Sequence, residues 1–175
     1  MADRKALPTD NDYRNQLMSV SLFNASTAQG KILSLLIKAK GLDSVEYAEK
    51  SQYAPDDFAH ESTLVDNGHV IHGTIVIALY LEQRYPSPAL LPQDPEKASI
   101  VMMLFRAILQ HGRAGLDLST YKLHLCTHGY ITGDRASFVD VAVAALASED
   151  DPFWSSFIKR LQDSWGSWSD DPNAI

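Results

Sequence analysis

The sequence predicts two small domains, an α/β domain followed by a helical domain. In the first half, short apolar runs typical of strands alternate with longer runs at helical spacing, whereas the second half contains helical patterns only. Between the halves lies a proline-rich stretch, residues 86–95, whose composition is typical of a stiff linker. We therefore expect a flexible N-terminal extension at 1–17, an α/β domain at 18–86, a linker at 87–94 and a helical domain at 95–175.

The first elements of the α/β half are predicted from local patterns. Residues 18–23 alternate and then become fully apolar, which predicts a strand, and residues 29–40 have apolar side chains at helical spacing. Residues 24–27 provide side-chain oxygens that can cap this helix, and Gly41 is a typical helix stop. Residues 45–48 predict a second short strand.

A hairpin and a third helical element complete this half. Two β-prone runs flank Asp66-Asn67-Gly68, and Asn and Gly tolerate the positive φ that a tight turn requires. The following residues, 75–85, predict a helix of about three turns, for which Thr74 is the expected N-cap.

The helical half contains the clearest capping signal of the chain. Ser137 and Asp140 have the three-residue spacing of a capping box and precede an apolar run. Pro95 suits the first turn of a helix, where its missing N–H costs nothing. The helices expected here cover residues 96–111, 112–132 (weakly patterned), 141–146 and 152–165.

Composition excludes several classes of function. The net charge is −7 and the sequence contains no basic stripe, so direct binding to DNA or RNA is not expected. The N-terminal residues are polar and no apolar run approaches the roughly 20 residues that cross a bilayer. We expect a cytoplasmic protein without a membrane segment.

The cysteine and histidine content argues against a metal site. Cys126 is the one cysteine, so neither an internal disulfide nor a cysteine-rich zinc site can form, and a free thiol suits a reducing compartment. His124 and His128 are four residues apart, but no carboxylate or cysteine pair adjoins them. We expect no metal.

Several stretches of the chain carry family-type motifs in a defined order and separation. They are Leu35-Leu-Ile-Lys-Ala-Lys-Gly-Leu42, Thr63-Leu-Val-Asp66, Ala78-Leu-Tyr-Leu-Glu-Gln-Arg-Tyr-Pro86, Tyr85-Pro-Ser-Pro-Ala-Leu-Leu-Pro92 and Ile131-Thr-Gly-Asp-Arg-Ala-Ser-Phe-Val-Asp140. Together these stretches resemble the glutathione transferase superfamily, most closely the bacterial stringent starvation protein A group. The resemblance covers about residues 18–165 and implies a thioredoxin-like first domain, with a helical second domain shortened relative to the family.

The resemblance also implies where glutathione would bind. Family members that use glutathione place a Ser, Cys or Tyr at the start of the first helix, where the helix terminus favours the thiolate. Ser26 and Thr27 occupy this region. They are candidates for a catalytic role, although a plain capping role for Ser26 is the favoured interpretation.

Two further elements of that site are altered. The family has a cis-proline before the third strand and a Glu-Ser pair at the start of the third helix. Here Ser62 takes the place of the proline, followed by Thr63, and the pair is Gly73-Thr74. We expect a trans bond before Ser62, because a cis bond to a non-proline residue costs about 3–4 kcal/mol. These four residues therefore indicate a vestigial glutathione site, with no cofactor.

The stringent starvation protein A group implies a different function. Its members are transferase-like without the activity and bind RNA polymerase holoenzyme through a surface next to a Pro-His-Pro stretch of the linker. The matching residues here are Tyr85, Pro86, Ser87 and Pro88, with Ser87 in place of the histidine. These are the candidate partner-binding residues; alternatively, the prolines only stiffen the linker.

The leading hypothesis is a non-catalytic interaction protein, a transcription-linked regulator that binds RNA polymerase or a comparable large partner. The family commonly pairs the first domain of one subunit with the helical domain of another, so we expect a homodimer. One alternative is a glutathione-dependent transferase that uses Ser26 or Thr27. Another is a protein of a mobile element that mimics or blocks a host factor.

Overall fold

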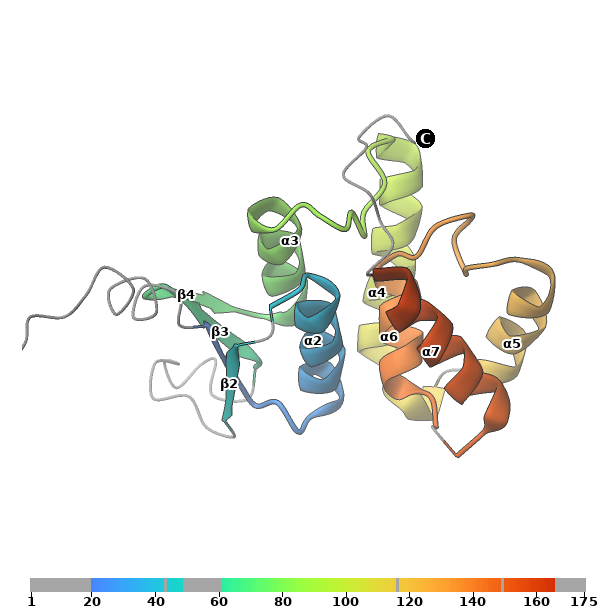
Figure 1. Cartoon of the computed structure of the whole chain (residues 1–175), viewed down its shortest axis with the longest axis horizontal. Coiled ribbons are helices and arrows are strands. Elements are labelled where there is room, and N and C mark those ends of the chain that lie inside the picture. Colours follow the sequence, from blue (N-terminus) through green and yellow to red (C-terminus); the bar gives the residue numbers. More distant parts are fainter. Residues whose placement is uncertain (1–19, 43, 49–60, 116, 149, 166–175) are drawn as a thin grey trace, which may run out of the picture.

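The protein is built in three layers. The computed structural model describes residues 20–42, 44–48, 61–115, 117–148 and 150–165. A sheet forms the first layer, helices α2 and α3 the second, and helices α4 to α7 the third (Figure 1). The expected extension at 1–17 and the last ten residues lie outside the described residues.

The sheet contains four short strands in the order β2-β1-β3-β4. Strand β1 pairs in parallel with β2 and antiparallel with β3, and β3 pairs antiparallel with β4. All four strands predicted from the sequence are confirmed. Their bounds are Val20–Phe23 (β1), Val45–Ala48 (β2), Thr63–Asp66 (β3) and His69–His72 (β4).

The predicted hairpin is also confirmed. In the turn between β3 and β4, Asn67 has a φ of 50° and Gly68 a φ of 81°. Two central residues at positive φ define the mirror-image turn that matches the twist of a hairpin, which explains why Asn and Gly occupy these positions.

Helices α2 (Ala28–Ala39) and α3 (Thr74–Arg84) follow the predicted ranges closely. Thr27 is the N-cap of α2, as the run of capping oxygens predicted. The prediction that Thr74 caps α3 is wrong, because Gly73 is the N-cap, with a φ of 85°. A glycine adopts this conformation without strain, and Thr74 becomes the first helical residue.

Four helices form the third layer: α4 (Pro95–Gly115), α5 (Leu118–Thr127), α6 (Phe138–Leu146) and α7 (Pro152–Trp165). The first of them continues past the predicted end through a kink at Gly112, whose φ is 57°. The weak pattern of residues 112–132 resolves into the end of α4 and the short α5. No helix within the described residues is long and apolar enough to cross a membrane.

One hydrophobic core runs through all three layers. Helix α2 packs on β1 on one side and on α6 on the other, and α6 is buried along almost its whole length. The rings of Phe105 and Phe138 lie 5.4 Å apart, centroid to centroid, at the α4–α6 contact. The capping box predicted at Ser137 and Asp140 is confirmed at the start of α6. The two halves therefore share their interior.

Candidate functional site

The loop between β1 and α2 folds tightly against the first turn of α2. A Cβ on Gly30 would lie 2.2 Å from the carbonyl oxygen of Asn24, so only glycine fits beneath this loop. The Thr27 hydroxyl donates to that same Asn24 oxygen (2.8 Å) and accepts from the Gly30 N–H (2.9 Å). Thr27 is exposed, and so is its neighbour Ser26. Thus Thr27, rather than Ser26, caps the helix.

The segment that leads into β3 is tied to this loop. The Asn24 side-chain amide donates to the carbonyl oxygen of Glu61 at 2.7 Å. The single cis peptide bond among the described residues is Ser87–Pro88, so the bond before Ser62 is trans, as expected. The Ser62 hydroxyl is buried and, within the described residues, has no hydrogen-bond partner.

The next residue, Thr63, faces the hairpin. It is fully buried, and its Oγ1 lies 3.0 Å from Nδ1 of His72 on the paired strand β4. The Thr63 hydroxyl is therefore used in a contact between strands β3 and β4.

The start of α3 completes the cluster. The Gly73 N–H donates to the carbonyl oxygen of Ser62 at 3.0 Å. The hydroxyl of Thr74 donates to Oε1 of Gln29, in the first turn of α2, at 3.2 Å. Oε2 of Glu61 lies 3.0 Å from the position that a Cβ on Gly73 would take, so a carboxylate stands at the beginning of α3.

The structure therefore brings the three predicted regions together. The start of α2, the start of β3 and the start of α3 adjoin one another. The Asn24 side chain bonds to the Glu61 backbone, the Gln29 side chain accepts from Thr74, and the Glu61 carboxylate lies near Gly73, three contacts that the sequence patterns do not indicate. Gly30 is the one local signal that could have indicated this arrangement, because a glycine inside the first turn of a helix often marks a close backbone approach.

The linker residues lie elsewhere. Pro86 and Ser87 are exposed. Pro88 is buried, and its carbonyl oxygen accepts from Nζ of Lys40 at 2.6 Å. The Tyr85 hydroxyl donates to Oδ2 of Asp66 at 2.9 Å, and burial, followed by this bond, raises the pKa of Tyr85 to about 12.

The histidines form no metal centre with the groups that the structure describes. Within those residues, no three His, Cys, Asp or Glu side chains lie close enough together to hold a metal ion. The rings of His124 and His128 stack at 4.3 Å on the exposed end of α5.

Comparisons with known proteins identify the fold. The sequence matches no protein-family model, and a search of curated proteins finds no match. The structure is similar to a glutathione S-transferase from Rhodospirillum rubrum F11, with a TM-score of 0.59 and 17% identity over 87% of this chain and 94% of that chain.

Two similar structures contain glutathione. One is a glutathione transferase homologue from Burkholderia GL BGR1, with a TM-score of 0.59 and 20% identity over 85% of this chain and 96% of that one. The other is a theta-class enzyme from Xanthomonas axonopodis pv. citri, with a TM-score of 0.58 and 14% identity over 87% and 98%.

The chain therefore has the glutathione transferase fold. It consists of a thioredoxin-like part, which contains the sheet with α2 and α3, and a helical part, which contains α4 to α7. The fold class predicted from the sequence is confirmed. At these identities the likeness establishes the fold alone, and the activity has to be argued from the site itself.

Proposed function

We propose that this chain is a non-catalytic interaction protein that uses the glutathione transferase fold to bind a large protein partner. The observation that carries the proposal is the set of bonds around Asn24. Its backbone oxygen accepts from the Thr27 hydroxyl, and its side-chain amide donates to the Glu61 carbonyl. Groups that the family resemblance assigns to glutathione are thus bonded to the protein itself.

Each of these internal bonds removes a contact that the ligand would need. Thr27 uses its hydroxyl proton on Asn24, so it has none to donate to a thiolate. In the family, the resemblance implies, the backbone beside the cis-proline pairs with the glutathione peptide; here the Glu61 carbonyl in that segment already accepts from the Asn24 amide at 2.7 Å. The Thr74 hydroxyl donates to Gln29. Glutathione would have to displace all three internal hydrogen bonds. Exchanging an internal hydrogen bond for one to the ligand adds little net binding free energy.

A calorimetric titration with glutathione tests the non-catalytic part of the proposal. We expect no saturable heat that corresponds to a dissociation constant below about 1 mM, which is roughly 4 kcal/mol of binding. An active glutathione transferase titrated in the same buffer is the positive control. Saturable binding tighter than this limit would overturn the proposal.

For the partner, we propose RNA polymerase holoenzyme or a comparable large assembly, which makes the protein a transcription-linked, cytoplasmic regulator. The support is the sequence resemblance to the stringent starvation protein A group. Within the linker the contact would be restricted to Pro86 and Ser87, since Pro88 is buried and Tyr85 donates to Asp66.

A binding assay between the purified full chain and purified polymerase holoenzyme tests this partner. We expect binding that Ser87→Glu weakens at least about tenfold, through the cost of placing an unpaired charge in an interface. Ser155→Glu, at an exposed position of α7, is the matched control and should bind like the parent. Absence of binding, or equal weakening by both variants, would argue against this partner and this surface.

One observation favours a second candidate, a glutathione-dependent transferase that uses Ser26. Glu61 places a carboxylate beside Gly73, where the expected acid of the Glu-Ser pair is missing. This carboxylate could receive the ammonium group of glutathione in place of the lost residue. Retention on a glutathione resin, together with conjugation of an electrophile that Ser26→Ala abolishes, would establish the enzyme. A chain that flows through the resin would exclude it.

A further inference from the structure

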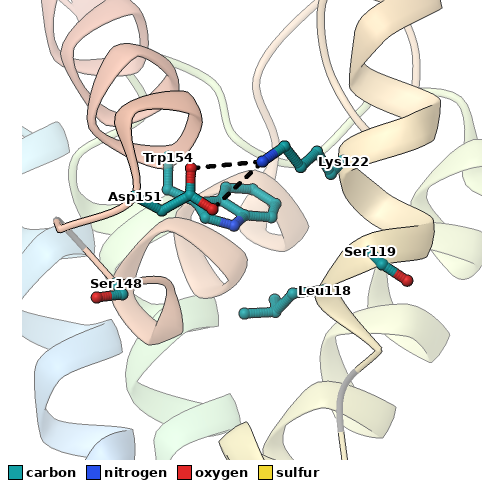
Figure 2. A pocket seen from close by; sticks show the side chains of 6 residues that line it. All are labelled: Leu118, Ser119, Lys122, Ser148, Asp151 and Trp154. Atoms are coloured by element: carbon teal, nitrogen blue, oxygen red, sulfur yellow. Dashed lines mark hydrogen bonds and ion pairs between the residues drawn. The ribbon is translucent and has the colours of Figure 1, made fainter.

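A separate, open cleft of about 380 Å³ lies in the helical part, between the first half of α5 and three residues near the end of α6 and the start of α7: Ser148, Asp151 and Trp154 (Figure 2). Its volume falls within the range of small-molecule sites. Figure 1 places α5 on the side of the molecule away from the sheet, so the cleft is remote from the start of α2. The lining residues are Leu118, Ser119, Lys122, Ser148, Asp151 and Trp154.

Two opposite charges meet across this cleft. Nζ of Lys122, on α5, lies 3.3 Å from Oδ2 and 3.4 Å from Oδ1 of Asp151, at the start of α7. Their side chains remain 41% and 38% exposed. Ion pairs that are exposed to this degree contribute little to stability. A ligand can therefore replace the bond between the two residues at small cost.

The carboxylate is fixed in place by the helix that it caps. Oδ1 of Asp151 accepts from the Phe153 N–H at 2.9 Å, and this bond, aided by Lys122, holds the pKa of Asp151 below its usual range. A simple anion at Lys122 would therefore face a permanent negative charge. A simple cation at Asp151 would equally face Lys122. A ligand that carries both charges avoids both conflicts.

Apolar surface lies beside the charges. Figure 2 shows Leu118 reaching into the hollow and the Trp154 ring behind the ion pair. Trp154 is itself buried and packs edge-on against Phe153 and Phe157, so this wall is rigid. The cleft thus combines a positive group, a negative group and an apolar wall within one small volume.

We propose that this cleft is a binding site for a small zwitterion with an apolar side chain, the chemistry of an aliphatic α-amino acid. The ligand carboxylate pairs with Lys122 and its ammonium group with Asp151, while its side chain lies against Leu118 and Trp154. The site goes beyond the proposed function and does not depend on it.

Calorimetric titration of the full chain with L-leucine tests the proposal directly. We expect saturable binding. N-acetyl-L-leucine lacks the positive charge and L-leucinamide lacks the negative one, so each should bind at least about tenfold more weakly, because a hydrogen bond to a charged group is lost. No saturable binding of L-leucine at 20 mM, or equal binding of N-acetyl-L-leucine, would overturn the proposal.

Two variants assign the binding to this cleft. Lys122→Met and Asp151→Asn should each weaken L-leucine binding at least about tenfold. Asparagine also caps helices well, so the second change preserves the start of α7. Lys159→Met, at an exposed position of α7 outside the cleft, should bind like the parent. If Lys122→Met also binds like the parent, the ligand does not occupy this site. Circular dichroism verifies that each variant is folded. If a variant does not fold, the titrations of the parent chain with L-leucine, N-acetyl-L-leucine and L-leucinamide still test the proposal.

Discussion

Lys40 and Glu82 form an ion pair inside the protein, with Nζ 2.6 Å from Oε2. The Lys40 side chain is 0% exposed, and its second bond goes to the carbonyl oxygen of Pro88. Glu82 in turn accepts the N–H groups of Leu90 and Leu91. Burial lowers the pKa of Lys40, while Glu82 acts in the opposite direction. This pair therefore attaches the linker to α2 and α3.

The first prediction removes one partner of that pair. Lys40→Met should lower the free energy of unfolding by about 3 kcal/mol, because it leaves the Glu82 carboxylate, whose side chain is only 13% exposed, without its cation. Lys38→Met, at an exposed position of the same helix, should change it by less than about 0.5 kcal/mol. Urea unfolding followed by circular dichroism measures both. Equal midpoints for the parent and Lys40→Met would show that the pair is not needed.

The second prediction concerns the capping box of α6. Asp140 is 0% exposed and accepts from the Ile131 N–H, the Ser137 N–H and the Ser137 hydroxyl. A solvated cap is worth about 1 kcal/mol, and burial should raise the cost of Asp140→Ala to about 3 kcal/mol. Exposed Asp134→Ala is the control.

A partner-binding assay distinguishes a structural role of Asp140 from a functional one. Well below its melting temperature, Asp140→Ala should bind its partner like the parent. A variant that melts like the parent yet loses the partner would assign Asp140 to the binding surface instead.

The third prediction tests the close approach beneath the β1–α2 loop. A Cβ on Gly30 would collide with the Asn24 backbone, so Gly30→Ala should destabilise the protein by about 2 kcal/mol despite the better helix propensity of alanine. Nothing lies within 4 Å of a Cβ on Gly129, so Gly129→Ala should be nearly neutral. Thermal unfolding compares them. A Gly30→Ala protein that is as stable as the parent would mean that this loop moves aside freely.

The fourth prediction concerns alkaline pH. The pKa of Tyr85 is about 12 in the folded protein and about 10 in an unfolded chain. The stability linked to this group is therefore fully present below pH 10 and is lost as the pH rises from about 10 through about 12. Tyr85→Phe should flatten this decline in urea unfolding, because it removes the hydroxyl that donates to Asp66. A decline of equal slope in parent and Tyr85→Phe would contradict the assignment.

The fifth prediction is the homodimer. Large apolar side chains are exposed on α3 and α4: Val76 (55%), Ile100 (48%) and Met103 (63%). Light scattering at micromolar concentration should give twice the 19.4 kDa mass of the chain. Met103→Asp should shift the mass toward the monomer, whereas Leu123→Asp, at the most exposed large apolar residue of α5, should not. A monomer mass for the parent chain would exclude the dimer.

The elements that could be predicted from the sequence are those with local causes. The Asn67–Gly68 turn and the Ser137–Asp140 box each combine a defined backbone conformation with a short-range bond, so a few residues suffice to indicate them. The N-cap of α3 has no local signal, because Gly73 takes its φ of 85° where the hairpin ends and where its N–H bonds to Ser62. A bond between residues that are far apart in sequence leaves no local pattern.

The same limit applies to the candidate site. The family resemblance located Ser26, Thr27, Ser62 and Thr74, and the structure places their segments side by side. The resemblance could not indicate that Asn24 bonds to Glu61, 37 residues further along the chain, or that Gln29 bonds to Thr74, 45 residues further along. In the proposed function these bonds compete with glutathione, and they depend on where α2, β3 and α3 come together.

The position of α2 between the sheet and α6 has a consequence for synthesis on the ribosome. Its first neighbours, the strands, are complete once residue 72 has been made, but α6 ends at residue 146. During that interval the apolar side of α2 that will contact α6 has no cover. A nascent chain with such a surface is prone to misassociation. The longer the helical half takes to be translated, the longer this apolar side of α2 stays exposed before α6 can cover it.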